Sequence, residues 1–122
     1  MARTILTVDD SLTMLKSIKI VLENAGYQVE QAQNGQAGLT ALDKIGKVDA
    51  IITDLNMPIM DGISFIKAAR QKKTCKFTPI IMLTTEAQAA KKEEGRKAGA
   101  TAWIVKPFKP EQLLAVLKKV GV

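Results

Sequence analysis

The chain has 122 residues, a net charge of +6, 47% hydrophobic residues and one cysteine. This length predicts one domain that buries its core without disulfides, and the unpaired Cys75 suits a reducing cytosol. Because histidine is absent, the sequence excludes a catalytic Ser-His-Asp triad, a histidine-ligated zinc site and a phosphohistidine carrier.

Strand-like and helix-like segments alternate five times along the chain. The predicted strands are the short apolar runs at residues 4–8, 27–32, 50–53, 79–83 and 101–105. The predicted helices lie between Ser11 and Gly26, at about residues 36–45, 63–71 and 87–98, and from Pro110 onward. This alternation predicts an α/β fold for residues 1–122, a single domain with a five-stranded parallel sheet and helices on both faces.

The first strand starts at residue 4, which leaves too few residues before it for a signal peptide, and no apolar run is long enough to span a membrane. We therefore expect a soluble cytoplasmic protein without a membrane partner. The strand ends in the acidic pair Asp9-Asp10, and Ser11 can cap the helix that follows. Further along, Asn34-Gly35 predicts a turn.

The third strand is a short apolar run that stops at Asp54. Pro58 and the pair Asp61-Gly62 then interrupt regular structure, and Asp61 can cap the next helix. An acid in the loop after a buried strand lies where open α/β sheets bind their ligands. Asp54 is therefore the first candidate for a functional side chain.

The helix predicted at residues 87–98 is rich in alanine and charge. It should bury little and be the most exposed of the five helices, which makes it a candidate moving part. From Ala87 onward, eight lysines or arginines accompany three glutamates. No aromatic residues are interleaved with the basic ones, so we expect no nucleic-acid partner and favour a solvated face that docks an acidic protein.

Four of the five predicted strands are followed by polar side chains: Asp9 and Asp10, Asp54, Thr84, and Lys106. In a doubly wound sheet these carboxyl ends open into one crevice. Three carboxylates there repel one another, and Mg²⁺ is the cation that best offsets hard oxygen ligands with no nitrogen or sulfur among them. Together with a lysine and a hydroxyl donor, these groups suit phosphoryl transfer to Asp54.

These elements resemble one family over essentially the whole chain. The ordered set of motifs resembles the receiver domain of two-component response regulators. The set consists of Asp9-Asp10, Asp54 with the Met-Pro-Ile-Met-Asp-Gly segment at 57–62, Thr84, and the Lys-Pro-Phe segment at 106–108. The resemblance is to the single-domain, CheY-like chemotaxis type. It implies the flavodoxin-like strand order 2-1-3-4-5.

The resemblance also implies roles for single residues. Asp54 corresponds to the aspartate that is phosphorylated by a histidine kinase. Asp9 and Asp10 correspond to the Mg²⁺ ligands, together with Asp54 and the backbone carbonyl of Asn56. Lys106 corresponds to the lysine that pairs with the phosphoryl group, and its peptide bond to Pro107 is expected to be cis.

Four positions are expected to control the switch and the lifetime of the phosphorylated form. Thr84 corresponds to the switch hydroxyl, and Trp103 stands at the switch aromatic position, where the family often has tyrosine or phenylalanine. Asn56 and Glu86 match the chemotaxis type and are expected to position the attacking water, so that dephosphorylation is fairly quick. The protein should therefore catalyse only its own phosphorylation and dephosphorylation.

The expected output is the binding of a protein target, most specifically the flagellar motor switch, to the surface of residues 87–98, residues 101–105 and the last helix. We expect a monomer, with a phosphatase among its partners. One alternative is a phosphorelay intermediate that passes its phosphoryl group to a histidine phosphotransfer protein. Flavodoxins are disfavoured by the acidic turn after the first strand, and haloacid dehalogenase-type phosphatases by Asn56, where they have a second acid.

Overall fold

The computed structural model of the protein describes residues 2–122, in which five strands alternate with five α-helices. The strands are β1 (Thr4–Val8), β2 (Gln28–Ala32), β3 (Ala50–Thr53), β4 (Ile80–Thr84) and β5 (Ala102–Val105). The helices are α1 (Leu12–Asn24), α2 (Gly35–Ile45), α3 (Gly62–Arg70), α4 (Ala89–Ala98) and α5 (Pro110–Lys119), with a short 3-10 helix, η1 (Lys73–Cys75), between α3 and β4. The alternation predicted from the sequence is confirmed.

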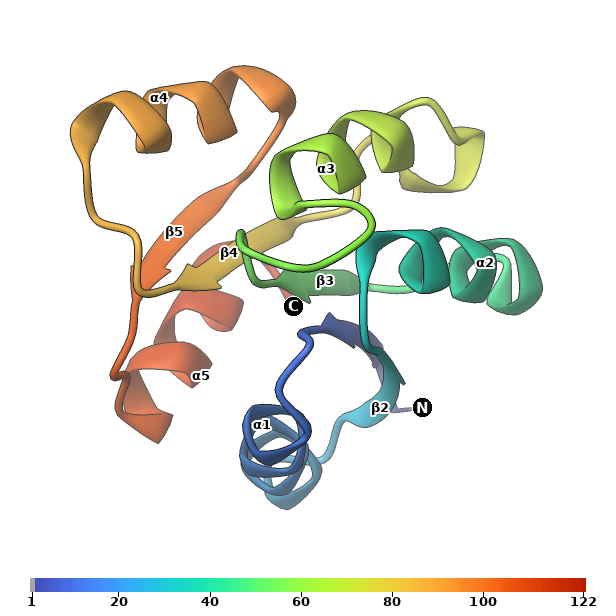
Figure 1. Cartoon of the computed structure of the whole chain (residues 1–122). Coiled ribbons are helices and arrows are strands. Elements are labelled where there is room, and N and C mark those ends of the chain that lie inside the picture. The colour runs from blue at the N-terminus through green and yellow to red at the C-terminus, as the bar shows by residue number, and fades with distance from the viewer. Residues whose placement is uncertain (1) are drawn as a thin grey trace.

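The strands form one parallel sheet in the order β2-β1-β3-β4-β5, as the resemblance implied. Helices α2, α3 and α4 cover one face of this sheet, and α1 and α5 cover the other (Figure 1). The central strands β1, β3 and β4 are mostly apolar, as expected for strands that are covered on both faces.

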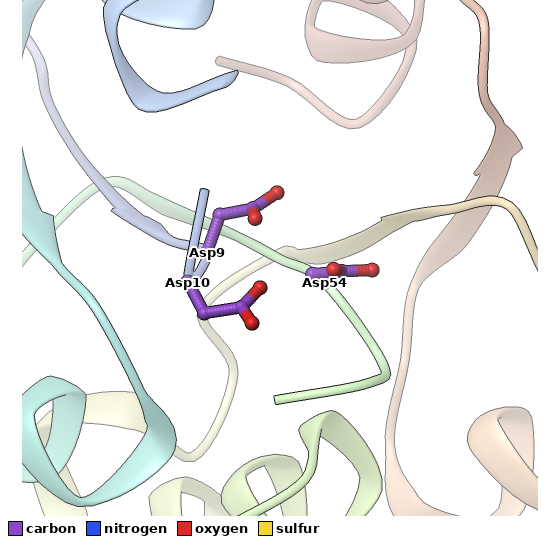
Figure 2. Close-up of side chains that lie close together, drawn as sticks. All are labelled: Asp9, Asp10 and Asp54. Carbon is purple, nitrogen blue, oxygen red and sulfur yellow. The ribbon is translucent and has the colours of Figure 1, made fainter. Parts of the chain in front are cut away.

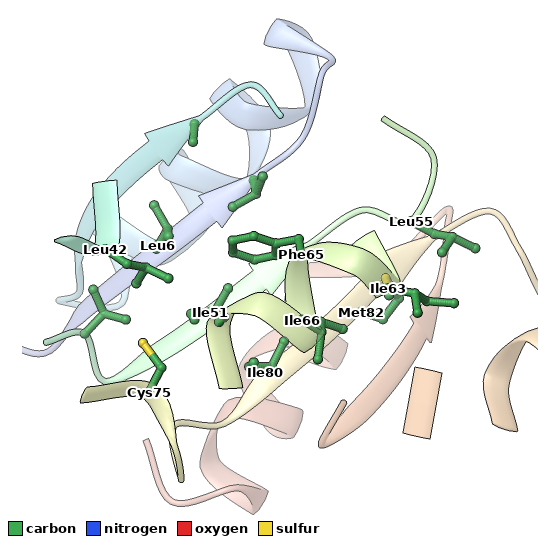
Figure 3. Packing of buried hydrophobic residues seen from close by; sticks show 14 residues of the cluster. Leu6, Leu42, Ile51, Leu55, Ile63, Phe65, Ile66, Cys75, Ile80 and Met82 are labelled. Carbon is green, nitrogen blue, oxygen red and sulfur yellow. The ribbon is translucent and has the colours of Figure 1, made fainter. Parts of the chain in front are cut away.

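Successive residues of each strand point to opposite faces and so divide the core in two. Leu6 and Ile51 pack beneath α2 and α3, where Phe65 is fully buried among them (Figure 3). Ile5 and Ile52 lie on the other face, against α1 and α5. The buried faces hold the sheet rigid and thereby fix the ends of its strands.

The helix starts follow from capping side chains, with a few differences from the prediction. The Ser11 hydroxyl accepts from the Met14 N–H, and the Asp61 carboxylate accepts from the Ser64 N–H, which confirms both predicted caps. Asn34 also caps a helix, so the predicted turn at Asn34-Gly35 is in fact the start of α2.

Two details near β4 also differ from the prediction. The segment before β4, predicted as a plain polar loop, contains η1. Helix α4 begins at Ala89 rather than at residue 87 and has only Gly95 buried, which confirms that it is the most exposed helix.

Within residues 2–122, no helix combines the length and apolar character needed to cross a membrane.

Arg70, the last residue of α3, connects two loops through hydrogen bonds. Its guanidinium donates to the carbonyl oxygens of Cys75 at 2.7 Å, Thr78 at 2.6 Å and Gly99 at 2.7 Å. Cys75 itself is fully buried. One side chain therefore holds both the connection between α3 and β4 and the turn between α4 and β5.

We predict that Arg70→Met lowers the free energy of unfolding by about 2–4 kcal/mol, because several half-buried carbonyls lose a charged donor at once. Urea denaturation followed by circular dichroism measures this. Arg96→Met is the matched control, since Arg96 is exposed and its one ion pair among residues 2–122 is with the neighbouring Glu93 in α4, and it should leave stability nearly unchanged. Equal losses in both variants would contradict the role given to Arg70.

Candidate functional site

Three carboxylates meet at the carboxyl end of the sheet. Oxygen atoms of Asp9, Asp10 and Asp54 all lie within 4.8 Å of one another. Figure 2 shows Asp9 and Asp10 extending from the loop after β1 toward the side on which Asp54 lies. Asp9 is buried, Asp54 is half-buried and Asp10 is exposed, so the cluster opens to solvent on one side.

The pairing of the strands explains why these distant residues converge. β1 and β3 are neighbours with Val8 opposite Thr53, so the next residue of each strand, Asp9 or Asp54, emerges at the same edge. The hydrogen bonding continues one step further, because the Asp54 N–H donates to the Val8 carbonyl at 2.9 Å. The sheet therefore positions the backbone of the acidic residues directly.

Lys106 supplies the positive charge of the site. Its Nζ lies 2.9 Å from Asp9 Oδ2 and 3.7 Å from Asp54 Oδ2, and its side chain is largely buried. The Lys106 N–H donates to the Thr84 carbonyl at 2.8 Å, which anchors the loop after β5 to the end of β4. The Lys106–Pro107 peptide bond is cis, as the resemblance implied.

The site is left with an excess of negative charge. Three carboxylates and one ammonium leave two negative charges when all are ionised. Carboxylate oxygens are hard ligands, and no histidine or cysteine belongs to the cluster. The donor set and its charge therefore fit one divalent cation that prefers oxygen.

The pKa of Asp54 is raised above its ordinary value, chiefly because burial disfavours the charged form. The ammonium of Lys106 lowers this pKa and the carboxylate of Asp9 raises it, while the Thr84 hydroxyl and the Leu55 N–H lower it. The Leu55 N–H donates to Asp54 Oδ1 at 2.8 Å. This backbone N–H belongs to the site, but it could not be predicted from the sequence because a backbone donor does not depend on the type of residue at position 55.

The loop between β3 and α3 passes very close to Asp54. A Cβ atom at Gly62 would lie 2.2 Å from the Asp54 carbonyl oxygen, so only glycine fits there. Within the loop, Ile59 has a φ of +71°, and the Met60 N–H donates to the Pro58 carbonyl at 2.7 Å across it. A β-branched residue in this region of backbone space is strained.

Trp103 on β5 connects the loop after β4 to helix α4. Its indole N–H donates to the Glu86 carbonyl at 2.8 Å, and the Glu86 N–H lies 3.4 Å from the Thr84 hydroxyl oxygen. The ring packs against the backbone of α4, where a Cβ atom at Gly95 would lie 2.6 Å from Trp103 Cζ3. The fully buried Thr84 is thus linked to α4 through a short chain of contacts.

The structure brings most of the candidate residues together, but some of them lie at the margin of the site. Asp9, Asp54 and Lys106 form one charged cluster, with Asp10 at its open side. Asn56 is exposed on the loop two residues beyond Asp54. The role of Gly95 was missed from the sequence, where the only sign was a glycine inside a helix of alanine and charged residues.

The chain is similar to known proteins over most of its length. A sequence model of the response regulator receiver domain matches residues 5–118. The chain is 41% identical over 117 residues to the chemotaxis protein CheY1 of Helicobacter pylori, an alignment that covers 95% of this chain and 94% of CheY1.

Solved structures are also similar to the chain over nearly its whole length. The chemotaxis protein CheY4 of Vibrio cholerae is 47% identical, with a TM-score of 0.94 and coverage of 98% of this chain and 99% of CheY4. The receiver domain of a sensor histidine kinase from Pseudomonas aeruginosa, solved with a magnesium ion coordinated in its active site cleft, is 28% identical with a TM-score of 0.91, and 100% of each chain is covered.

We predict that Asp54→Asn stabilises the protein against urea at pH 7 in EDTA. Because the pKa of Asp54 is raised in the folded state, the folded protein keeps this proton at pH values where the unfolded chain, with a pKa of about 3.9, has lost it. Wild-type stability therefore falls as the pH rises through that interval, and the advantage of the variant should shrink as the pH is lowered toward 4.

Asp61→Asn is the control for this experiment, because Asp61 is exposed and asparagine keeps the capping oxygen. It should change stability little at any pH. If Asp54→Asn proved less stable than the wild type at pH 7, attraction to Lys106 would outweigh burial.

A second prediction concerns Ile59. Asparagine tolerates a positive φ better than isoleucine, and the Ile59 side chain is 81% exposed, so Ile59→Asn should raise the free energy of unfolding by about 1 kcal/mol. Thermal unfolding measures it. Ile20→Asn removes an exposed isoleucine from the helical backbone of α1 and should give no gain. A loss of stability in Ile59→Asn would show that the loop is not strained.

Proposed function

The chain belongs to the response regulator receiver family, and from this premise we propose that it is a phosphorylation switch in which Asp54 accepts a phosphoryl group from the phosphohistidine of a histidine kinase. The observation that carries the proposal is the cluster of Asp9, Asp10 and Asp54 around the ammonium of Lys106. A lone surface aspartate would lack both the charge balance and the neighbours that phosphoryl transfer needs.

Phosphoryl transfer needs little covalent chemistry from the protein beyond the nucleophile. A carboxylate oxygen of Asp54 attacks the phosphorus, the bond between phosphorus and the imidazole nitrogen of the kinase breaks, and the imidazole leaves with the electron pair. Lys106 Nζ lies 3.7 Å from Asp54 Oδ2, close enough to pair with an oxygen of the transferred group. The Thr84 hydroxyl can donate to another of its oxygens.

Mg²⁺ is the cation we propose for the three carboxylates, with the backbone carbonyl of Asn56 as a further ligand. When bound, it neutralises charge on the phosphoryl oxygens. The donor set of the cluster supports this assignment, as does the magnesium ion named for the Pseudomonas aeruginosa receiver domain. Without a cation, Asp9 and Asp54 repel each other, and the ammonium of Lys106 is the positive charge that offsets this repulsion.

The switch is proposed to run from Thr84 through Trp103 to α4. If Thr84 moves toward a phosphoryl group, its contact with the Glu86 N–H changes, and so does the loop carbonyl that holds the Trp103 indole. Helix α4 packs on this indole at Gly95 and is otherwise mostly exposed, so it is the helix most easily displaced. The new charge at Asp54 thus biases a distant helix.

The output proposed is binding of a protein target to the surface formed by α4, β5 and α5. The names of the relatives support a role in chemotaxis, and the flagellar motor switch is the target we propose on that basis. We further propose that the protein works as a cytoplasmic monomer, that a phosphatase shortens its signal, and that Asn56 and Glu86 position the water that hydrolyses the aspartyl phosphate.

We predict that acetyl phosphate or beryllofluoride changes the emission of Trp103, the only tryptophan, and that EDTA abolishes the response. Asp54→Asn should give no response. Asp10→Asn should weaken the Mg²⁺ affinity measured by calorimetry about tenfold or more, since it removes one charged ligand. Asp61→Asn, which removes a nearby acid outside the cluster, should keep both properties.

An unchanged emission in wild-type protein that binds Mg²⁺ normally would contradict the switch. The output is tested separately by offering the phosphorylated protein a purified motor switch protein and a histidine phosphotransfer protein. Binding of the first without onward transfer favours chemotaxis, and rapid transfer to the second favours a relay intermediate.

A further inference from the structure

The edge of the sheet opposite Asp54 carries a second surface that the proposed switch does not use. Here the connections that enter β3 and β4 lie side by side, beyond the C-terminal ends of α2 and α3 (Figure 1). Between them is a hollow of about 370 Å³. Its walls include Lys47, Asp49, Lys73, Thr74 and Phe77.

Phe77 is the most unusual residue of this edge, because 88% of its surface is exposed. It is the most exposed of the large hydrophobic side chains among residues 2–122. The ammonium of Lys76 lies 5.9 Å from the centre of its ring, a distance that allows a cation–π contact. The ring therefore stands at the rim of the hollow with positive charge beside it.

The loop that presents Phe77 is held firmly. Arg70 donates to the carbonyls of Cys75 and Thr78, on either side of the ring, and the Thr78 hydroxyl donates to the Thr74 carbonyl at 3.3 Å. Cys75 fixes the start of this stretch in the core. Because the backbone is already ordered, presenting the ring to a partner costs little conformational entropy.

The charge around the hollow is largely uncompensated. Lys47, Lys73 and Lys76 form no ion pair with any residue between 2 and 122, whereas Lys72 is paired with Asp43. The one acid in the wall, Asp49, already accepts from the Thr4 N–H at 2.7 Å. Lysines are favourable near the C-terminal ends of α2 and α3, but the helix dipoles do not explain an exposed ring among them.

We propose that this edge, defined by Lys47, Lys73, Lys76 and Phe77, binds an acidic peptide segment of a partner protein that carries an apolar side chain. The lysines match the acids of the segment, and its apolar side chain packs on Phe77 at the mouth of the hollow. The hollow has the size of a small ligand site and so accommodates a few side chains of such a segment. This surface lies at the far end of the strands from Asp54, so the inference does not rest on the proposed function.

Two other partners fit the observations less well. An anionic membrane is a flat surface, whereas Lys47 and Lys73 here line a hollow with an acid in its wall. A nucleic acid is held by many phosphate contacts and by several stacked bases, and this edge offers three free lysines and a single ring.

The test is a titration of the ¹⁵N-labelled full chain with the capped peptide Glu-Asp-Glu-Leu-Leu-Glu-Asp-Glu, followed by amide chemical shifts. We expect saturable shifts confined to residues 47–49 and 73–79. Phe77→Ser should weaken binding about tenfold, and Lys73→Glu combined with Lys76→Glu should abolish it. All three side chains are exposed, so the variants should fold normally.

Ile20→Ser is the matched control, because Ile20 is 60% exposed on α1 and remote in sequence from this edge, and it should bind like the wild type. A peptide with lysine at every acidic position should not bind. The proposal is overturned if the acidic peptide gives no shifts at this edge, if Phe77→Ser binds as well as the wild type, or if oligothymidine or phosphatidylserine vesicles shift these amides when the peptide does not.

Discussion

The ammonium of Lys106 between Asp9 and Asp54 is the interaction on which the rest of the site depends. Two carboxylates held this close by rigid strands repel each other, and the burial of Asp9 removes the water that would screen them. One lysine offsets this repulsion only in part. The folded chain therefore keeps a local excess of negative charge that favours a cation.

The sheet keeps two kinds of surface apart. Its carboxyl edge gathers the charged cluster, because parallel strands all end on that side. Its amino edge carries the firmly held loop of Phe77, tied down by Arg70. Between the two edges lie strands whose side chains are buried on both faces. Because this packed core is rigid, a change at one surface should leave the structure of the other surface intact.

Much of the fold and of the site could be predicted from the sequence, because the features involved are local or periodic. Apolar runs gave the strands, and Ser11 and Asp61 marked two helix starts correctly. Asn34 was misread as part of a turn, since the same residue type favours turns and helix caps. The hydrogen bond from Trp103 to Glu86 and the strained backbone of Ile59 depend on tertiary contacts that no local pattern records.

The packing of α4 on the ring of Trp103 has a consequence for the slow local opening of the structure. Gly95, which packs on the indole of Trp103, is the one buried residue of the helix, and Ala98 is partly buried against the core. Few contacts must break for this segment to detach, whereas α3 would have to expose Phe65 and Ile66. Amide protons of α4 should accordingly exchange with deuterated solvent far sooner than those of α3, through excursions in which the sheet stays intact.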